Sequence, residues 1–185
     1  MKECNHLTWL VLTKRPERIR DHLPPDWGET GYPNVWLGTT VGVRASYKRM
    51  DLLRQLPCKR RFLSIEPLLE DLHDIDLRRI DWILVGGMSG PLWEEKGMKI
   101  EWAASLYDKA KAAGIPYFWK QISAYRSENG IDALGLYLAQ RAGIEVDPDA
   151  VNLVRQVPET DLPMMALDRE KGKRLTAKQL VSIGL

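Results

Sequence analysis

The sequence is poor in cysteine, with only Cys4 and Cys58 among its 185 residues. The two lie far apart and show neither a CxxC motif nor paired Cys/His spacing. This usage is typical of a reducing compartment and argues against a cysteine-ligated metal site formed by this chain alone. Histidine is also scarce, and its three residues are scattered without the spacing of metal ligands. The sequence therefore predicts no metal site of its own.

Long apolar runs and a strong charge imbalance are missing as well. No run approaches the roughly 18 residues that span a bilayer, and the apolar stretch at 7–12 is too short and wrongly flanked for a signal peptide. The net charge of +2 is too small to predict, on its own, a nucleic-acid or membrane partner. A composition of 44% hydrophobic and 28% charged residues is typical of a globular domain. We therefore expect a cytoplasmic protein with one sizeable core and no membrane partner.

Five short apolar runs, rich in β-branched or aromatic residues, predict β-strands. They are residues 7–12, 34–38, 61–65, 81–87 and 115–120. Segments with helical signals separate several of them, namely 16–23, 45–56 and 100–114. Strands that alternate with helices indicate βα units and a parallel sheet.

The last third of the chain has a different character. Residues 132–143 predict one more helix, ending at Gly143. The segments after it lack a clear period and predict an irregular extension, in which Thr176 is a candidate cap of a short final helix. We therefore expect a domain at 1–125 and a helical and irregular extension at 126–185 that packs on it.

Polar or glycine residues follow every one of the five apolar runs. Ligands of parallel α/β proteins bind outside the carboxyl ends of the strands, and in a barrel all these ends face one site. A doubly wound sheet would concentrate polar residues at a single switch point instead. The pattern favours an α/β fold of about five strands, a partial parallel (β/α) barrel. The strand-end candidates are Thr13, Lys14, Arg15, Gly38, Thr39, Ser64, Glu66, Gly86, Gly87, Ser89, Gly90, Lys120 and Gln121.

Glu66 is the most informative of these candidates. Strand alternation places it on the same face as Phe62 and Ser64. A carboxylate beside buried strands needs a partner, which Lys14, Arg15 or Lys120 could supply. A structural ion pair at the barrel mouth is the alternative to a functional role, and Thr39 could equally be a cap or turn residue.

The segment GGMSG at 86–90 predicts a turn in which Gly86 and Gly87 allow close backbone approach. Ser89 and Gly90 would expose N–H groups able to hold an anion or a carboxylate. The motif is neither GxGxxG nor a P-loop, so a tight structural turn explains it as well.

Taken in order and spacing, the motifs LTKRPERI, NVWLGTTV, RFLSIEPLL, DWILVGGMSG and AGIPYFWKQ resemble the C-terminal half of the phage gene-product thirty-seven/sixty-eight family, a branch similar to the radical S-adenosylmethionine (SAM) enzymes. The resemblance covers about residues 7–123. It implies a (β/α) barrel whose upstream half carries three cysteines for a four-iron, four-sulfur cluster. This chain has no such triplet, so the cluster would come from a missing N-terminal half.

The resemblance also implies roles for the strand-end residues. Glu66, Lys14 and Lys120 would be the catalytic candidates, and the other strand-end candidates would bind SAM. Two features depart from the family pattern: Met88 replaces an acidic residue in the glycine turn, and TTVGV at 39–43 lacks the usual acidic or amide residue.

Three functional hypotheses follow. The first is the C-terminal portion of a phage-type radical-SAM-like protein, paired with a second copy or with a separate N-terminal half because an open parallel sheet leaves edges to be covered. The second is a non-catalytic nucleotide- or phosphate-binding module. The third is a phage-derived interaction protein whose basic segment at 169–178 contacts a protein or nucleic acid.

Overall fold

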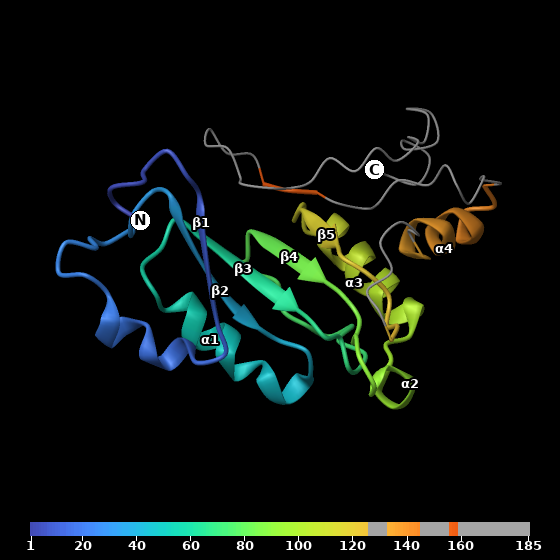
Figure 1. The fold of residues 1–185 in the computed structure, drawn as a ribbon. Helices are drawn as coiled ribbons and strands as arrows, with labels where there is room; N and C mark the ends of the chain where they lie inside the picture. The colour runs from blue at the N-terminus through green and yellow to red at the C-terminus, as the bar shows by residue number, and fades with distance from the viewer. Residues whose placement is uncertain (126–132, 145–155, 159–185) are drawn as a thin grey trace.

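A five-stranded, all-parallel sheet forms the centre of the protein in a computed structural model that describes residues 1–125, 133–144 and 156–158. The strand order is β1-β2-β3-β4-β5, so neighbours in sequence are neighbours in the sheet (Figure 1). The strands are β1 (Trp9–Thr13), β2 (Val35–Thr40), β3 (Arg60–Ile65), β4 (Trp82–Val85) and β5 (Tyr117–Trp119). All five predicted strands, and the α/β class, are confirmed.

The helices match the predicted segments with two differences, and one short helix, α2 (Trp93–Lys96), was not predicted. They are η1 (Pro16–Arg18), η2 (Arg20–His22), η3 (Arg44–Ser46), α1 (Lys48–Arg54), α2 (Trp93–Lys96), α3 (Ile100–Ala112) and α4 (Ala133–Arg141). The segment at 16–23 forms two short 3₁₀ turns, because Pro16 starts it and the prolines at 24 and 25 leave room for little more than two turns. In α3 the buried stripe ends at Ala110, and Ala113 is exposed beyond the helix.

The strand order never reverses, so the described sheet has no topological switch point. Right-handed crossovers between sequential parallel strands put their helices on one side of the sheet. Figure 1 shows α1 and α3 on the same side. We call this side the outer face and the opposite side the inner face.

The outer face carries the main core. Strand residues that alternate along the chain, such as Leu37, Leu63 and Ile83, are at most 2% exposed and pack against Leu53 of α1 and Leu106 of α3. Burial of these aliphatic side chains is the main source of stability of the sheet-helix layer. Phe62 lies on the other face of β3, as strand alternation predicts.

The inner face carries a second, smaller core of four aromatic side chains, which we call the inner aromatic layer: Trp36, Phe62, Trp82 and Phe118. The Trp82 ring meets Trp36 and Phe118 edge-on, with ring centroids 6.0 and 5.9 Å apart. The amino-terminal part of the inner face is therefore packed with side chains, as is the interior of a barrel.

Residues 156–158 run along the inner side of the sheet (Figure 1, red-orange). Gln156 accepts a hydrogen bond from Trp82 Nε1 at 2.9 Å and donates its own N–H to Tyr117 O at 2.8 Å. Val157 packs against the inner aromatic layer. The edge of β5 that faces away from β4 is therefore already hydrogen-bonded at Tyr117, by Gln156 of the same chain.

The part of the predicted extension that the structure describes includes α4, which ends before Gly143 (φ +69°), as predicted. Arg141 of α4 donates two hydrogen bonds of 2.7 Å to Asp108 of α3. Thr176 and the basic segment at 169–178 lie outside the described residues. Within the described residues, no helix has the length and apolar character that crossing a bilayer requires.

Candidate functional site

The carboxyl end of the inner face brings together Glu66 and Lys120, from the ends of β3 and β5. Lys120 Nζ donates to Glu66 Oε2 at 2.6 Å. Of the three cations that the sequence offered as partners, the structure selects Lys120. The Glu66 side chain is 19% exposed and that of Lys120 is 45% exposed, so the pair is open to a ligand from solution.

Gly86 explains how the two side chains can meet across β4. A Cβ on Gly86 would lie 3.3 Å from Lys120 Cβ and 3.4 Å from Glu66 Cγ. The missing side chain therefore leaves the space that the ion pair occupies. Gln121 is adjacent, with its Nε2 3.7 Å from the same point and 3.4 Å from Gly87 O. Glu66 precedes a cis peptide bond to Pro67.

Ser64 completes this group because it alternates with Phe62 on the inner face of β3 and is 6% exposed. Thr40 of β2 is its register partner and is 7% exposed. Thr40 also follows from the sequence as a polar residue at this strand end, but it was not among the candidate site residues, although alternation from Thr39 puts it on the inner face. Arg49 Nη1 donates to Thr40 O at 3.0 Å and anchors this strand end.

The glycine turn at 86–90 uses most of its backbone N–H groups internally. Gly86 donates to Ile65 O, Gly87 to Gln121 O, and Gly90 to Tyr125 O. Met88 donates to Ser123 Oγ at 2.9 Å. The Gly90 N–H is therefore occupied, contrary to the prediction of an exposed anion-binding group. Ser89, which is exposed, lies in an isolated parallel bridge with Ala124.

Gly38 and Thr39 of β2 do not join the ion pair. The Phe62 ring fills the space over Gly38, where a Cβ would come within 2.4 Å of the ring. Thr39 alternates with Leu37 on the outer face, is fully buried, and donates to Thr13 O at 2.8 Å. Its role here is to tie β2 to β1, which is neither the predicted ligand contact nor the cap or turn role given as its alternative.

Thr13, the last residue of β1, and Lys14 and Arg15 after it make no contact with the ion pair in the described part of the chain. Thr13 Oγ1 accepts from the Arg15 N–H at 3.0 Å, so it forms a local turn. Arg15 Nε lies 3.5 Å from Glu17 Oε1. Lys14 is exposed, and no described residue pairs with its ammonium group.

The sequence analysis also did not predict a polar cluster that joins η3 and the residue after it to the loop before β4. Arg44 Nε donates to Asp74 Oδ1 at 3.1 Å, and Tyr47 donates to the same oxygen at 2.8 Å. Burial, and then this hydrogen bond, raise the pKa of Tyr47 well above its usual range. The partners are 27 and 30 residues apart in sequence, and no motif links them. Each charged group in this cluster has a partner. The cluster therefore has a structural role: it holds the segment of Arg44 and Tyr47 against the loop of Asp74.

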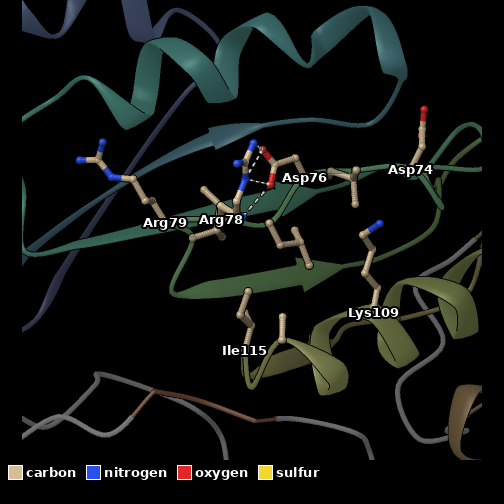
Figure 2. Close-up of a pocket in the computed structure, with 10 residues that line it drawn as sticks. Asp74, Asp76, Arg78, Arg79, Lys109 and Ile115 are labelled. Atoms are coloured by element: carbon tan, nitrogen blue, oxygen red, sulfur yellow. Dashed lines mark hydrogen bonds and ion pairs between the residues drawn. The ribbon is translucent and has the colours of Figure 1, made fainter.

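A cavity of about 590 Å³ lies near the opposite end of the sheet, between the loop before β4 and α3 (Figure 2). Its wall is the loop from Asp74 to Ile80, together with Lys109 and Ile115. Because this loop precedes β4, the cavity faces the amino ends of the strands, where barrel proteins carry stabilising rather than catalytic groups.

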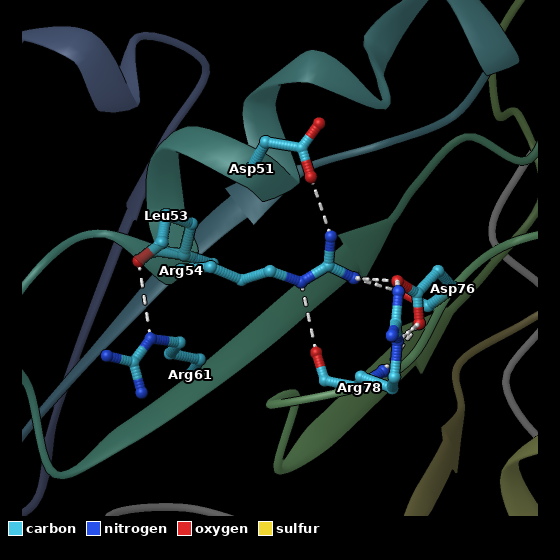
Figure 3. A network of polar contacts seen from close by, with 6 residues as sticks. All are labelled: Asp51, Leu53, Arg54, Arg61, Asp76 and Arg78. Atoms are coloured by element: carbon cyan, nitrogen blue, oxygen red, sulfur yellow. Dashed lines mark hydrogen bonds and ion pairs between the residues drawn. The ribbon is translucent and has the colours of Figure 1, made fainter.

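A network beside this cavity supports that interpretation (Figure 3). Arg54 of α1 donates to Asp51 at 2.7 Å, to Arg78 O at 3.0 Å and to the backbone carbonyl of Asp76. Arg61 donates to Leu53 O at 3.3 Å. These bonds satisfy carbonyls at the end of α1 and fix the loop before β4, so the network has a structural role.

Asp76 makes this network sensitive to acid. Hydrogen bonds from the side chain and backbone N–H of Arg78 lower the pKa of Asp76 from 3.8 to about 2. A lowered folded-state pKa gives stability that is complete above pH 3.8 and is lost as pH falls toward about 2. We expect Asp76→Asn to lose less stability than the wild type over this interval. The difference should stay below about 1 kcal/mol, since Asp76 is screened by solvent. Urea unfolding at the two ends of the interval measures it, and equal losses in both proteins would contradict it.

The thiols of this chain do not fit an iron–sulfur cluster. Such a cluster requires three thiolates held together, and the sequence has two cysteines. Cys58 is 8% exposed, and burial raises the pKa of its thiol, which disfavours the thiolate that binds metal. Among the described residues, no group of three or more His, Cys, Asp or Glu side chains could hold a metal ion.

A family model described as "Protein of unknown function (DUF5131)" matches residues 1–180. The chain belongs to this family. The DUF5131 match includes all five strands and the Glu66–Lys120 pair. No curated protein matches the chain, and no solved structure does. The description of DUF5131 names no activity.

Proposed function

We propose that the chain forms five consecutive strands of a (β/α) barrel and that Glu66 and Lys120 form one wall of a small-molecule site at its mouth. The observation that carries the proposal is the position of this ion pair: on the inner face, at the carboxyl ends of the strands, beyond a packed aromatic layer. Barrel enzymes bind their ligands at this end. The unreversed strand order supports a barrel over a doubly wound sheet.

The ligand that we propose is S-adenosylmethionine, held by its amino-acid end. A zwitterion carries an ammonium and a carboxylate on one carbon, so it can exchange partners with an ion pair: its ammonium goes to Glu66 and its carboxylate to Lys120. Ser64 and Gln121 lie beside the pair and add a hydroxyl and an amide. The resemblance to radical SAM enzymes motivates this choice of zwitterion.

Radical cleavage of SAM is not proposed for this chain by itself, because its thiols do not fit the cluster. In the proposed role, it binds and orients SAM, and a second chain would supply the iron–sulfur chemistry. Glu66 and Lys120 would then act as binding groups, and the exposed Lys14 has no described contact that ties it to them.

Isothermal titration calorimetry with SAM tests the ligand. We expect saturable binding by the wild type and a loss of about tenfold or more in affinity for Glu66→Gln and for Lys120→Gln, since each removes a charged hydrogen bond. Lys111→Gln, which removes an exposed charge on α3, is the matched control and should bind as the wild type. Equal affinities for all four proteins would contradict the proposed site.

The proposed barrel also needs further strands, and the free edge for them is at β1. Leu10 and Leu12 alternate on the inner face of β1 and are 43% and 49% exposed. In the described sheet no strand lies beyond β1, whereas Gln156 already binds the β5 edge. We propose that a strand from a second copy or from a separate N-terminal half pairs here.

Light scattering tests this pairing with the chain alone and with a partner chain. We expect an assembly larger than one chain, and its loss in the double variant Leu10→Lys/Leu12→Lys, because two buried ammonium groups would oppose the contact. An assembly of two identical chains identifies a second copy as the partner. The pairing is refuted if the wild type stays monomeric both alone and when mixed with each partner chain tested as the N-terminal half.

The phosphate-binding alternative has less support, because four of the five N–H groups of the glycine turn are used within the protein. The alternative of an interaction protein depends on the segment at 169–178, which lies outside the described residues.

A further inference from the structure

The outer face of β1 and β2 contains an apolar cavity that the proposed function does not use. Its volume is about 460 Å³, within the range of about 300–1,000 Å³ of small-molecule sites. Side chains of β1, β2 and the connection between them line it, among them Val11, Leu37, Ile19, Leu23 and Trp27. Because the only helical parts of this connection are two short 3₁₀ turns, no long helix among the described residues fills the space above these strands.

The cavity has fixed walls. Trp27 is 7% exposed and donates from Nε1 to Pro57 O at 2.7 Å. Tyr32 packs against it with ring centroids 4.7 Å apart and donates to Asp26. Lys2 closes the rim through an ion pair with Asp26. A hollow with a wall formed in part by Trp27 and Tyr32 suits a small molecule, whereas a packed helix, about 10 Å across, would need a longer and wider groove.

A second cavity of about 390 Å³ adjoins the first, and Ile19 and His22 line both. The cations Arg15 and Arg18 line the second cavity. Arg15 lies near Glu17, but the Arg18 guanidinium has no hydrogen-bonding or ionic partner among the described residues. His22 Nδ1 lies 2.8 Å from Arg18 O. One end of the combined space is therefore apolar, and the other is cationic.

We propose that these two cavities form one binding site for an amphipathic organic anion, with an apolar body of one or two rings beside Trp27 and an anionic group at Arg18. An unpaired guanidinium binds phosphate or carboxylate oxygens through parallel N–H groups. The apolar end supplies affinity and the cationic end supplies selectivity for charge. The site lies on the face of the sheet opposite Glu66 and does not depend on the proposed function.

Calorimetric titration with three probes tests this site: 1-naphthyl phosphate, uncharged 1-naphthol, and inorganic phosphate. We expect 1-naphthyl phosphate to bind best, because it alone occupies both ends. Arg18→Gln should weaken its binding about tenfold and leave 1-naphthol unchanged, since it removes one charged contact. Lys111→Gln is the matched control and should bind all probes as the wild type does.

The position of the probe is read from the indole N–H resonances of the tryptophans. We expect 1-naphthyl phosphate to shift the signal of Trp27 and leave that of Trp82, on the inner face, in place. Absence of saturable binding, equal affinity in Arg18→Gln, or a shift confined to Trp82 would overturn the proposal. Because SAM is tested at the other face with other variants, failure here is distinguishable from failure of the proposed function.

Discussion

Replacing Trp82 by alanine is expected to lower the free energy of unfolding by about 3–5 kcal/mol, the usual cost of removing a buried tryptophan. Trp82 is 2% exposed and contacts three other aromatic rings of the inner aromatic layer. The substitution also removes the hydrogen bond to Gln156 O, one of three hydrogen bonds that Gln156 makes with the sheet.

Equilibrium urea unfolding, followed by fluorescence and by circular dichroism, measures the effect. Trp82→Phe is the matched variant, because it keeps an aromatic ring and removes the N–H. We expect it to cost less than the alanine variant, with about 1 kcal/mol from the lost hydrogen bond. A cost of less than about 1 kcal/mol for Trp82→Ala would mean that the inner face is not a packed core.

Gly87→Ala is expected to destabilise the protein by about 3 kcal/mol or more, at the upper end of overpacking effects. A Cβ on Gly87 would lie 2.3 Å from Ser123 N and 2.5 Å from Ser123 Oγ. Neither atom can move freely: Ser123 Oγ accepts hydrogen bonds from Met88 N and Met98 N, and Gly87 itself donates to Gln121 O. The new methyl group would therefore separate the segment after β4 from the segment after β5, which carries Lys120 of the ion pair.

Gly114→Ala is the control for this substitution. Gly114 follows α3 with φ +66° and has open space around it, so alanine there costs about 1 kcal/mol through backbone conformation alone. Thermal or urea unfolding of the two variants separates the contributions. If Gly87→Ala costs no more than Gly114→Ala, the close approach of the two strand ends is not required.

The strands could be predicted from the sequence, whereas the partner of Glu66 could be predicted only in part. Short β-branched and aromatic runs predicted every strand, since such residues suit a sheet that is buried on both faces. The sequence limited the partner of Glu66 to three cations. Only the register of β3, β4 and β5 distinguishes Lys120 from Lys14 and Arg15. That register brings together Glu66 and Lys120, which are 54 positions apart, and no local sequence pattern encodes it.

Thr39 shows an inference that the sequence allowed but strand-end reasoning did not draw. Leu37 already marks the outer face of β2, and alternation puts Thr39 on that face and Thr40 on the inner one. The strand-end pattern counts every polar residue, whichever face of the sheet it lies on, and so it does not separate Thr39 from the inner-face candidates. The contact of Gln156 with β5, by contrast, brings together residues 39 apart in sequence, and no local pattern announces it.

The most direct test of the central claim is a titration of ¹⁵N-labelled protein with S-adenosylmethionine, followed by NMR. A ligand held by Glu66 and Lys120 should shift the backbone signals of Gly86, Lys120 and Gln121 together, along one saturation curve, and Glu66→Gln should abolish these shifts. Shifts confined to the outer face, or unchanged in Glu66→Gln, would contradict a binding site at the mouth of the sheet.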